Sequence, residues 1–299
     1  MSIRAQLFIT CLAEQFFPGV LKRMVDLLER LGVQVAFPEE QTCCGQPFFN
    51  SGHWTEARKM ARRWLHVFGK TEGPIVSPSG SCVDMVRHHY PQLFPPATPE
   101  RRLAEEVAAR TFEFTQFLVR ELKVTNVGAR FPHKVTYHAS CHLLRGLGVR
   151  EEPKTLLTNI EDLELVPLAG EETCCGFGGA FSVIYPEVSK AMMEAKVRAV
   201  EESGAEVVVA CDAGCLMNIA GGLQRANSPV KAMHLIEVLT AEPEQCSSTA
   251  KHAKHAKELH VFKALTRKDL KRRAGRFRPG SSFEVMRVGE SLRSWRSWR

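Results

Sequence analysis

The chain has 299 residues, 44% of them hydrophobic and 24% charged, which is typical of a soluble globular protein long enough for two domains. Its ten cysteines do not indicate a secreted disulfide scaffold, because the chain is long and its first residues lack the cleavage site of a signal peptide. The net charge of +7 does not indicate a nucleic-acid-binding protein, because residues 247–299 alone hold 15 Lys or Arg against 4 Asp or Glu, leaving 25 against 29 in the rest. We therefore expect a cytoplasmic protein with a mildly acidic globular part and a basic tail.

The first part of the chain alternates short apolar runs with amphipathic segments. Three runs rich in β-branched and aromatic residues predict β-strands: QLFIT, VQVAF and PIVSP, at 6–10, 33–37 and 74–78. Apolar residues spaced three and four apart predict two helices, one stopped by Gly32 and one stopped by Gly69. Residues 98–122 begin with a helix cap, Thr98, and with Pro99 in the first turn, and they predict one long helix that links two halves.

The second part of the chain repeats this alternation. Its three predicted strands are KVTYHAS, LELVPL and AEVVVA, at 134–140, 163–168 and 205–210. A helix is predicted from Pro186 to Ser203, with Gly204 after it. Strands that alternate with helices predict the α/β class, here as two pseudo-repeated lobes that each hold a parallel sheet. We expect a first lobe at 1–97, a linking helix at 98–130, a second lobe at 131–246 and a disordered basic tail at 247–299 that cluster binding does not need.

Eight cysteines form two copies of one pattern, about 130 residues apart. Each copy contains a single cysteine, an adjacent pair followed by glycine, and a final cysteine; the residues are Cys11, Cys43, Cys44 and Cys82, then Cys141, Cys174, Cys175 and Cys215. Adjacent cysteines are poor disulfide partners, because a disulfide needs Cα atoms roughly 4.4–6.8 Å apart and trans neighbours lie about 3.8 Å apart. The single and final cysteines follow predicted strands, and parallel sheets bind their ligands at the carboxyl ends of the strands. The repeat therefore predicts two sites.

Sets of four thiolates are typical of zinc sites and of iron–sulfur clusters. Zinc sites usually take their ligands from two short knuckles, whereas these cysteines come from separate loops with an adjacent pair between them. This spacing favours an iron–sulfur cluster in each repeat and leaves zinc as the alternative. Gly45 and Gly176 are predicted to contribute to cofactor binding, because glycine lets the backbone approach inorganic sulfide and donate an N–H to it.

The motifs also resemble those of a known family. TCCGQP and TCCGFGG, set in two Cys…Cys-Cys-Gly…Cys repeats, resemble the CCG-domain iron–sulfur proteins, which include the cysteine-rich subunit of heterodisulfide reductase and the glycolate oxidase iron–sulfur subunit. FPEEQTCCGQP, SPSGSC, TCCGFGGAFSV and CLMNIAGGLQ are most similar to the lactate utilization protein A family, over roughly residues 3–240.

This resemblance implies an electron-transfer subunit of an L-lactate-oxidising system. It implies two clusters, which we expect to be of the 4Fe-4S type, and two partner subunits, one of them another iron–sulfur protein. The subunit would carry electrons and would bind no lactate itself, so no catalytic residue is assigned to this chain. The basic tail is a candidate for contact with an anionic membrane surface.

Some positions depart from the pattern or leave alternatives open. The reductase branch has a further cysteine three residues before the last one of each repeat, where this chain has Ser79 and Asp212, and this argues against the alternative of a thiol or heterodisulfide reductase. Cys211 is either an additional ligand or a small buried residue at a strand end. His138 and His142 are alternative ligands beside Cys141, and Cys246 is expected to be a spare surface thiol.

Overall fold

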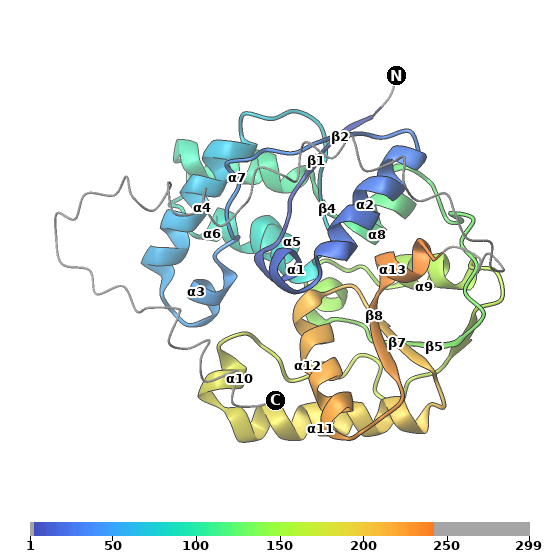
Figure 1. The fold of residues 1–299 in the computed structure, drawn as a ribbon. Coiled ribbons are helices and arrows are strands. Elements are labelled where there is room, and N and C mark those ends of the chain that lie inside the picture. Colours follow the sequence, from blue (N-terminus) through green and yellow to red (C-terminus); the bar gives the residue numbers. More distant parts are fainter. Residues whose placement is uncertain (1–2, 242–299) are drawn as a thin grey trace, which may run out of the picture. The chain divides into compact units, whose positions relative to one another are not determined.

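Two four-stranded parallel sheets form the frame of residues 3–241, the part of the chain that the computed structural model describes (Figure 1). The first sheet has the order β2-β1-β3-β4, and its strands are β1 Arg4–Leu7, β2 Gln34–Ala36, β3 Ile75–Ser77 and β4 Thr111–Glu113. The second has the order β6-β5-β7-β8, and its strands are β5 Lys134–Tyr137, β6 Glu164–Val166, β7 Val207–Ala210 and β8 Lys231–His234. We refer to residues 3–122 as the first lobe and to residues 131–241 as the second lobe. The predicted α/β class with two parallel-sheet lobes is confirmed.

All six predicted strands are present, and the two lobes pair them in the same way. Ala5 of β1 pairs with Val35 of β2, and Val135 of β5 pairs with Leu165 of β6. The predicted helices that end at Gly32, at Gly69 and near Ser203 are also present, as α2, α4 and α11. Each sheet has a fourth strand, β4 or β8, in addition to the three predicted ones.

Helical segments connect the strands. In the first lobe they are α1 Cys11–Phe16, α2 Pro18–Arg30, α3 Gln46–Asn50, α4 Trp54–Phe68, α5 Gly80–Asp84, α6 Tyr90–Gln92, α7 Pro99–Ala109 and α8 Phe114–Gln116, with π-helical turns η1 Met85–His89 and η2 Phe117–Glu121. In the second lobe they are η3 His142–Gly146, α9 Glu151–Thr158, α10 Phe181–Ile184, α11 Pro186–Glu202, α12 Ala213–Arg225 and α13 Leu235–Leu239. None of the helices within residues 3–241 has the length and apolar character needed to cross a membrane.

The prediction of one long helix over residues 98–122 is wrong. Thr98 does cap a helix by accepting a hydrogen bond from the Arg101 N–H, but that helix ends at Ala109. The next residues form β4, in which Phe112 pairs with Val76 of β3. Pairing with the edge of the sheet prevails here over helical periodicity, because Thr111 and Phe112 are residue types that favour strands. This segment completes the first sheet.

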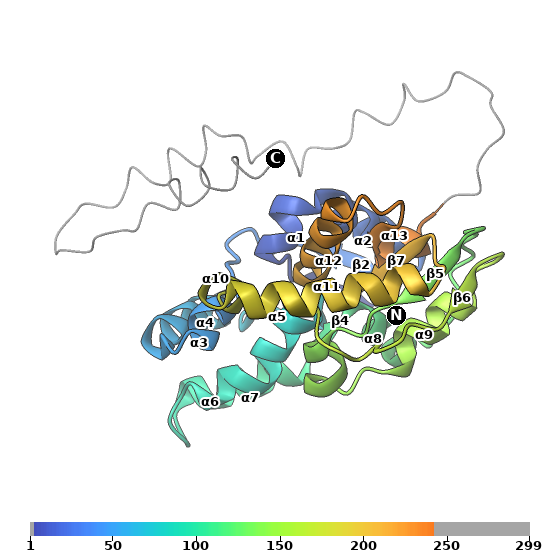
Figure 2. The same ribbon diagram turned by 90° about the horizontal axis from the view of Figure 1, so that it is seen from below.

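Three large apolar clusters pack on the two sheets. One cluster is shared by both lobes and joins one face of each sheet to α2, α9 and α13; its strand residues include Ala5, Leu7, Val135 and Val209. The opposite face of the first sheet packs on α4 and α7, through Phe8 and Ile75. The opposite face of the second sheet packs on α11 and α12, through Val208. Figure 2 shows α11 lying along the second lobe.

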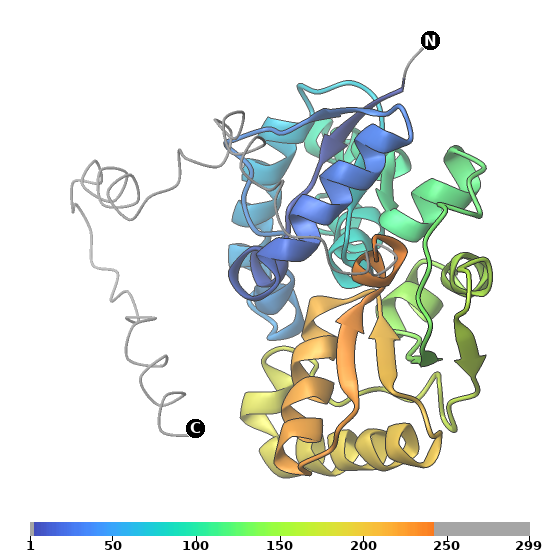
Figure 3. The same ribbon diagram turned by 45° about the vertical axis from the view of Figure 1, so that its right-hand side comes forward.

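The lobes contact each other reciprocally at the carboxyl ends of their strands. The helical segment after the first strand of each lobe packs against the one after the third strand of the other: α1 against α12, and η3 against α5. Helices α2 and α13, and likewise α8 and α9, also pack against each other. In Figure 3 the orange strands of the second lobe, β7 and β8, end toward the first lobe. The ends of the strands that lead into the cysteine-bearing segments therefore meet where the lobes meet.

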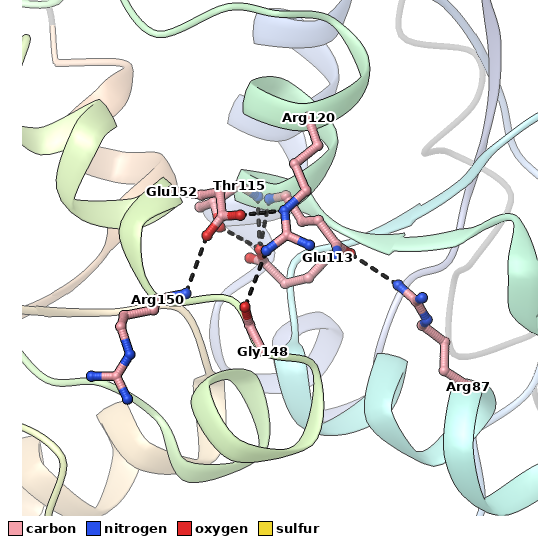
Figure 4. A network of polar contacts seen from close by, with 8 residues as sticks. Arg87, Glu113, Thr115, Arg120, Gly148, Arg150 and Glu152 are labelled. Atoms are coloured by element: carbon pink, nitrogen blue, oxygen red, sulfur yellow. Dashed lines mark hydrogen bonds and ion pairs between the residues drawn. The ribbon is translucent and has the colours of Figure 1, made fainter.

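A polar network adds to this contact (Figure 4). The Arg120 guanidinium pairs with the Glu152 carboxylate and donates a hydrogen bond of 3.0 Å to the Gly148 carbonyl. Glu152 also accepts from the Arg150 N–H at 3.1 Å, and its side chain is 9% exposed. Because the Glu152 charge is buried and paired across the lobes, loss of Arg120 would leave an uncompensated carboxylate.

Candidate metal centre

Each lobe brings its four repeated cysteines to the carboxyl end of its sheet. Cys11 opens α1 and Cys82 lies in α5; in the second lobe Cys141 precedes η3 directly and Cys215 lies in α12. The adjacent pairs lie in the loops after β2 and β6. The nine cysteines within residues 3–241 all carry free thiols. The sequence repeat is thus also a structural repeat.

In the first lobe the four sulfur atoms form a connected group. The Sγ atoms of Cys11 and Cys43 lie 3.6 Å apart, and those of Cys44 and Cys82 lie 3.5 Å apart. The Cys43 and Cys44 thiols also interact with each other. Cys44 and Cys82 are buried, whereas Cys11 and Cys43 are partly exposed. One side of the group therefore faces the core and the other faces the surface.

The second lobe has the same sequence of thiol contacts, from Cys141 to Cys174, Cys175 and Cys215. Here a histidine joins the group, because a ring nitrogen of His138 and the sulfurs of Cys175 and Cys215 all lie within 4.8 Å of one another. His138 is fully buried, and neither ring nitrogen has a hydrogen-bond partner. His142, the other histidine considered from the sequence, is the first residue of η3 and is partly exposed.

The thiols within each group shift one another's pKa. Hydrogen bonds from the Cys11 and Cys44 thiols and from the Gly45 N–H lower the pKa of Cys43. Hydrogen bonds from Cys141 and Cys175, and from the Gly176 N–H, lower the pKa of Cys174 in the same way. The neighbouring Cys11 and Cys141 thiols have raised pKa values, because each donates to a thiolate and is partly buried. Each site thus stabilises thiolate, the form that binds metal ions.

The two glycines hold the adjacent cysteines in place. Gly45 and Gly176 have φ values of +79° and +87°, a region that other residues rarely adopt. Their N–H groups lie 3.5 Å and 3.4 Å from the sulfurs of Cys43 and Cys174. A Cβ at Gly45 would lie 2.9 Å from the Cβ of Met60, and one at Gly176 would lie 2.6 Å from the Ser189 carbonyl oxygen. Glycine is therefore required both by the backbone conformation and by the close approach of α4 or α11.

Ser79 and Asp212, where the reductase branch has cysteines, are helix caps that bind each other. The Ser79 hydroxyl accepts from the Cys82 N–H at 3.4 Å, and the Asp212 carboxylate accepts from the Gly214 N–H at 3.1 Å. The same carboxylate accepts from the Ser79 hydroxyl at 3.1 Å and from the Ser81 N–H at 2.9 Å. A cysteine at either position would remove this bridge between the lobes.

The remaining cysteines divide into one that the structure places and one that it does not describe. Cys211 is fully buried in the cluster shared by the two lobes, with its sulfur 3.9 Å from the Tyr137 hydroxyl. The thiols of Cys175 and Cys215 belong instead to the outer cluster of the second lobe. Cys246 and the tail at 247–299 lie outside the described residues.

A known protein family matches the chain in two segments, and these are the segments that carry the two groups of thiols. The cysteine-rich domain family (CCG) matches residues 5–87 and 135–220. The chain belongs to this family. Its two CCG repeats coincide with the parts of the two lobes that carry the cysteines.

Curated relatives cover most of the described chain. Lactate utilization protein A of Exiguobacterium sp. is 51% identical over 240 residues, which are 80% of this chain and 98% of that protein. Lactate utilization protein A of Bacillus subtilis is 47% identical over 239 residues, which are 80% of this chain and 100% of that protein. Identities of this size over nearly the whole length of these relatives place the chain in the lactate utilization protein A family.

Among solved structures, a hypothetical protein from Helicobacter pylori is similar with a TM-score of 0.57 and 11% sequence identity. The match covers 81% of this chain and 50% of that chain, so this chain spans about half the length of that protein. At this level of identity the similarity shows the fold alone.

The donor sets of both CCG repeats fit an iron–sulfur cluster. Four free thiols converge in each lobe, thiolate is stabilised at one of them, and a backbone N–H points at its sulfur. Iron–sulfur clusters are held by four cysteine thiolates and are tuned by hydrogen bonds to sulfur. The sequence did not reveal two features of this environment: the burial of His138 against Cys175 and Cys215, and the contact between the cysteine-bearing segments of the two lobes.

Proposed function

We propose that the protein is an iron–sulfur electron-transfer subunit of a system that oxidises L-lactate to pyruvate. The observation that carries this proposal is the pair of equivalent four-thiol groups on either side of one lobe contact. The choice of lactate as the substrate of this system rests on the names of the relatives, which are lactate utilization proteins. Oxidation of one lactate to pyruvate releases two electrons and two protons, which a partner dehydrogenase would take up before this subunit receives the electrons.

In this proposal Cys11, Cys43, Cys44 and Cys82 hold one cluster, and Cys141, Cys174, Cys175 and Cys215 hold the other, both of the 4Fe-4S type. Bound clusters would supply one-electron carriers. The residues of the chain bind and orient them: α1 and α5 present the first set of thiols, and η3 and α12 present the second. Because α1 packs against α12 and α5 against η3, the two sets lie on adjoining segments, which suits exchange of electrons between lobes.

The proposal includes two further subunits, one of which is another iron–sulfur protein. They would oxidise lactate and pass the electrons onward, for example to a quinone. Attachment of the basic tail to an anionic membrane surface would bring the protein close to such an acceptor.

The test is anaerobic purification of the full chain from cells that grow on lactate. We expect iron and acid-labile sulfide in equal amounts, absorbance near 400 nm, and reduction by L-lactate only together with co-purifying subunits. Stoichiometric zinc without sulfide would overturn the cluster assignment. Turnover of disulfides with a reduced viologen dye, without reduction by lactate in the presence of the subunits, would instead support a reductase.

A further inference from the structure

The two thiol groups have different neighbours at equivalent positions of the fold. Phe8 directly follows β1 and donates its backbone N–H to Val76 of β3 at 2.9 Å; His138 directly follows β5 and donates to Val209 of β7 at 2.8 Å. Both side chains are fully buried. The first lobe thus places an apolar ring where the second lobe places an imidazole.

A second pair of equivalent positions lies on the helices that cover the thiols. The buried residues of α4 and α11 match one another at a constant offset: Ala57, Ala61, Trp64, Leu65 and Phe68 against Ser189, Met193, Lys196, Val197 and Val200. In this alignment Trp64 corresponds to Lys196. The match is independently supported by Gly45 and Gly176, which approach equivalent turns of the two helices.

In the first lobe these positions form an aromatic cluster. Trp64 packs on Phe8 with ring centroids 5.1 Å apart, and on Phe68 with centroids 4.2 Å apart. All three aromatic side chains belong to the apolar cluster that contains Cys44 and Cys82. The hydrogen-bond donors of the Trp64 and Tyr90 side chains in this cluster are neutral. The Trp64 indole N–H has no hydrogen-bond partner, and the Tyr90 hydroxyl donates to the Cys44 carbonyl at 2.9 Å. No charged side chain occupies either equivalent position.

In the second lobe the same positions are polar, and one carries a positive charge. Lys196 is 3% exposed, and its ammonium donates to the Gly170 carbonyl at 2.5 Å. An ammonium has three N–H groups, so this one bond leaves two of them available. Burial lowers the pKa of Lys196, and negative charge on the nearby Cys175, Cys215 and Cys174 sulfurs and on the Glu171 carboxylate opposes that shift. One ring nitrogen of His138 lies within 4.8 Å of the Cys175 and Cys215 sulfurs, and neither ring nitrogen has a hydrogen-bond partner.

Building on the proposed function, we infer that the cluster of the second lobe has a higher reduction potential than that of the first, set by His138 as a hydrogen-bond donor to its sulfur atoms and by the Lys196 charge. Reduction adds negative charge to a cluster, and a nearby donor or cation stabilises that charge more in the reduced form than in the oxidised one. Phe8 and Trp64 provide no such charge. A single electron supplied to the protein would therefore reside in the second lobe.

The test is an EPR-monitored redox titration of the anaerobic, cluster-loaded full chain with dithionite as reductant. We expect two separate one-electron transitions, and the one at higher potential should be the one that remains in a Cys44→Ser variant. Lys196→Met and His138→Phe should each lower this transition and leave the other unchanged. A tenfold change in the ratio of reduced to oxidised cluster corresponds to 59 mV for one electron.

The matched control is Lys190→Met, which removes a lysine charge from the exposed side of the same helix, α11. It should shift neither transition. Thermal melts of the metal-free variants check that each one folds.

Each alternative outcome has a definite meaning. Absence of iron and sulfide from the unmodified protein would overturn the proposed function itself. Normal iron content with equal potentials, or with a higher transition that neither variant moves, would overturn only the present inference. Loss of about half of the iron in His138→Phe would show that His138 is a ligand and would also overturn its role as a donor.

Discussion

The first lobe packs Phe8 and Trp64 at the positions where the second lobe packs His138 and Lys196, although both lobes hold their thiols on equivalent segments. The shared features are those that create a site: strand order, helix starts, a left-handed glycine and four cysteines. The features that differ are those that set its electrostatics. A duplicated fold can therefore keep one ligand set while its two sites acquire different environments.

A second contrast lies at the ends of the fourth strands. Glu113 ends β4 and caps α8; His234 ends β8 and caps α13. Burial raises the pKa of Glu113 to about 7, whereas burial lowers the pKa of His234 to about 4. Burial thus disfavours the charged form of both side chains, one an acid and one a base, and their effects on stability have opposite signs.

Removal of a single cysteine ligand should give the largest difference between the two lobes, in iron content and in EPR signal. Cys44→Ser should remove the cluster of the first lobe, and Cys175→Ser should remove that of the second, because a serine hydroxyl does not replace a buried thiolate. Each variant should lose about half of the iron and keep the EPR signal of the other lobe. Iron analysis with EPR is the measurement. If neither variant loses iron, or if one loses all of it, the lobes do not hold independent clusters.

The glycines after the adjacent cysteines should tolerate alanine unequally. An alanine at either position costs about 1–2 kcal/mol for its left-handed backbone. At both positions the new Cβ would lie 2.9 Å from the Cβ of a methionine on the covering helix, Met60 or Met192, and at Gly176 it would also lie 2.6 Å from the Ser189 carbonyl oxygen. Gly176→Ala should therefore cost about 1–3 kcal/mol more, because it adds a second and closer clash with the backbone of α11.

Urea unfolding of the two metal-free variants measures this difference. Gly52→Ala is the matched control, because Gly52 also has a positive φ of +80° and a Cβ there would meet no atom within 4 Å. Equal losses of stability at Gly45 and Gly176 would contradict the unequal packing.

Glu113 and His234 should make the stability of the protein depend on pH in opposite directions. Because the folded pKa of Glu113 is raised, its contribution to stability is complete below pH 4.5 and is lost as the pH rises to about 7. Because the folded pKa of His234 is lowered, its contribution is complete above pH 6.5 and is lost as the pH falls to about 4. Each contribution is at most about 3 kcal/mol.

Urea unfolding of metal-free protein between pH 4 and pH 8 measures these slopes. Relative to the unmodified chain, Glu113→Gln should make stability rise more steeply with pH, and His234→Asn should make it rise less steeply. Glutamine retains an acceptor for the Thr115 and Gln116 N–H groups that Glu113 binds. Parallel pH profiles of the three proteins would show that neither group titrates differently in the folded state.

The two caps that bind each other across the lobes offer a further comparison. Asp212→Ala removes an acceptor for Ser79, Ser81 and Gly214 and should cost about 2–3 kcal/mol, because these hydrogen bonds involve a charged group. Ser79→Ala removes a neutral cap and should cost about 1 kcal/mol. The double variant should cost less than the sum of the two, since the residues share a hydrogen bond. Strict additivity in urea unfolding would show that the bridge does not couple the lobes.

Much of this molecule was predictable from local pattern. Six strands, the helices α2, α4 and α11, and the convergence of four thiols per lobe all follow from apolar periodicity and from cysteines at strand ends. The fourth strands did not follow. Thr111 and Phe112 favour a strand, but three residues after a predicted helix are too short a signal, and the strand forms because the edge of β3 offers backbone partners.

Residue identity and spacing are enough to define the repeat, the candidate ligands and the need for glycine after each pair of cysteines. The surroundings of the two groups of thiols depend instead on tertiary packing. Nothing in local pattern shows that Lys196 is buried, or that both ring nitrogens of His138 lack a partner beside Cys175 and Cys215. Burial and electrostatic environment arise from segments far apart in the chain, and the same cysteine spacing is compatible with an aromatic or a charged neighbour.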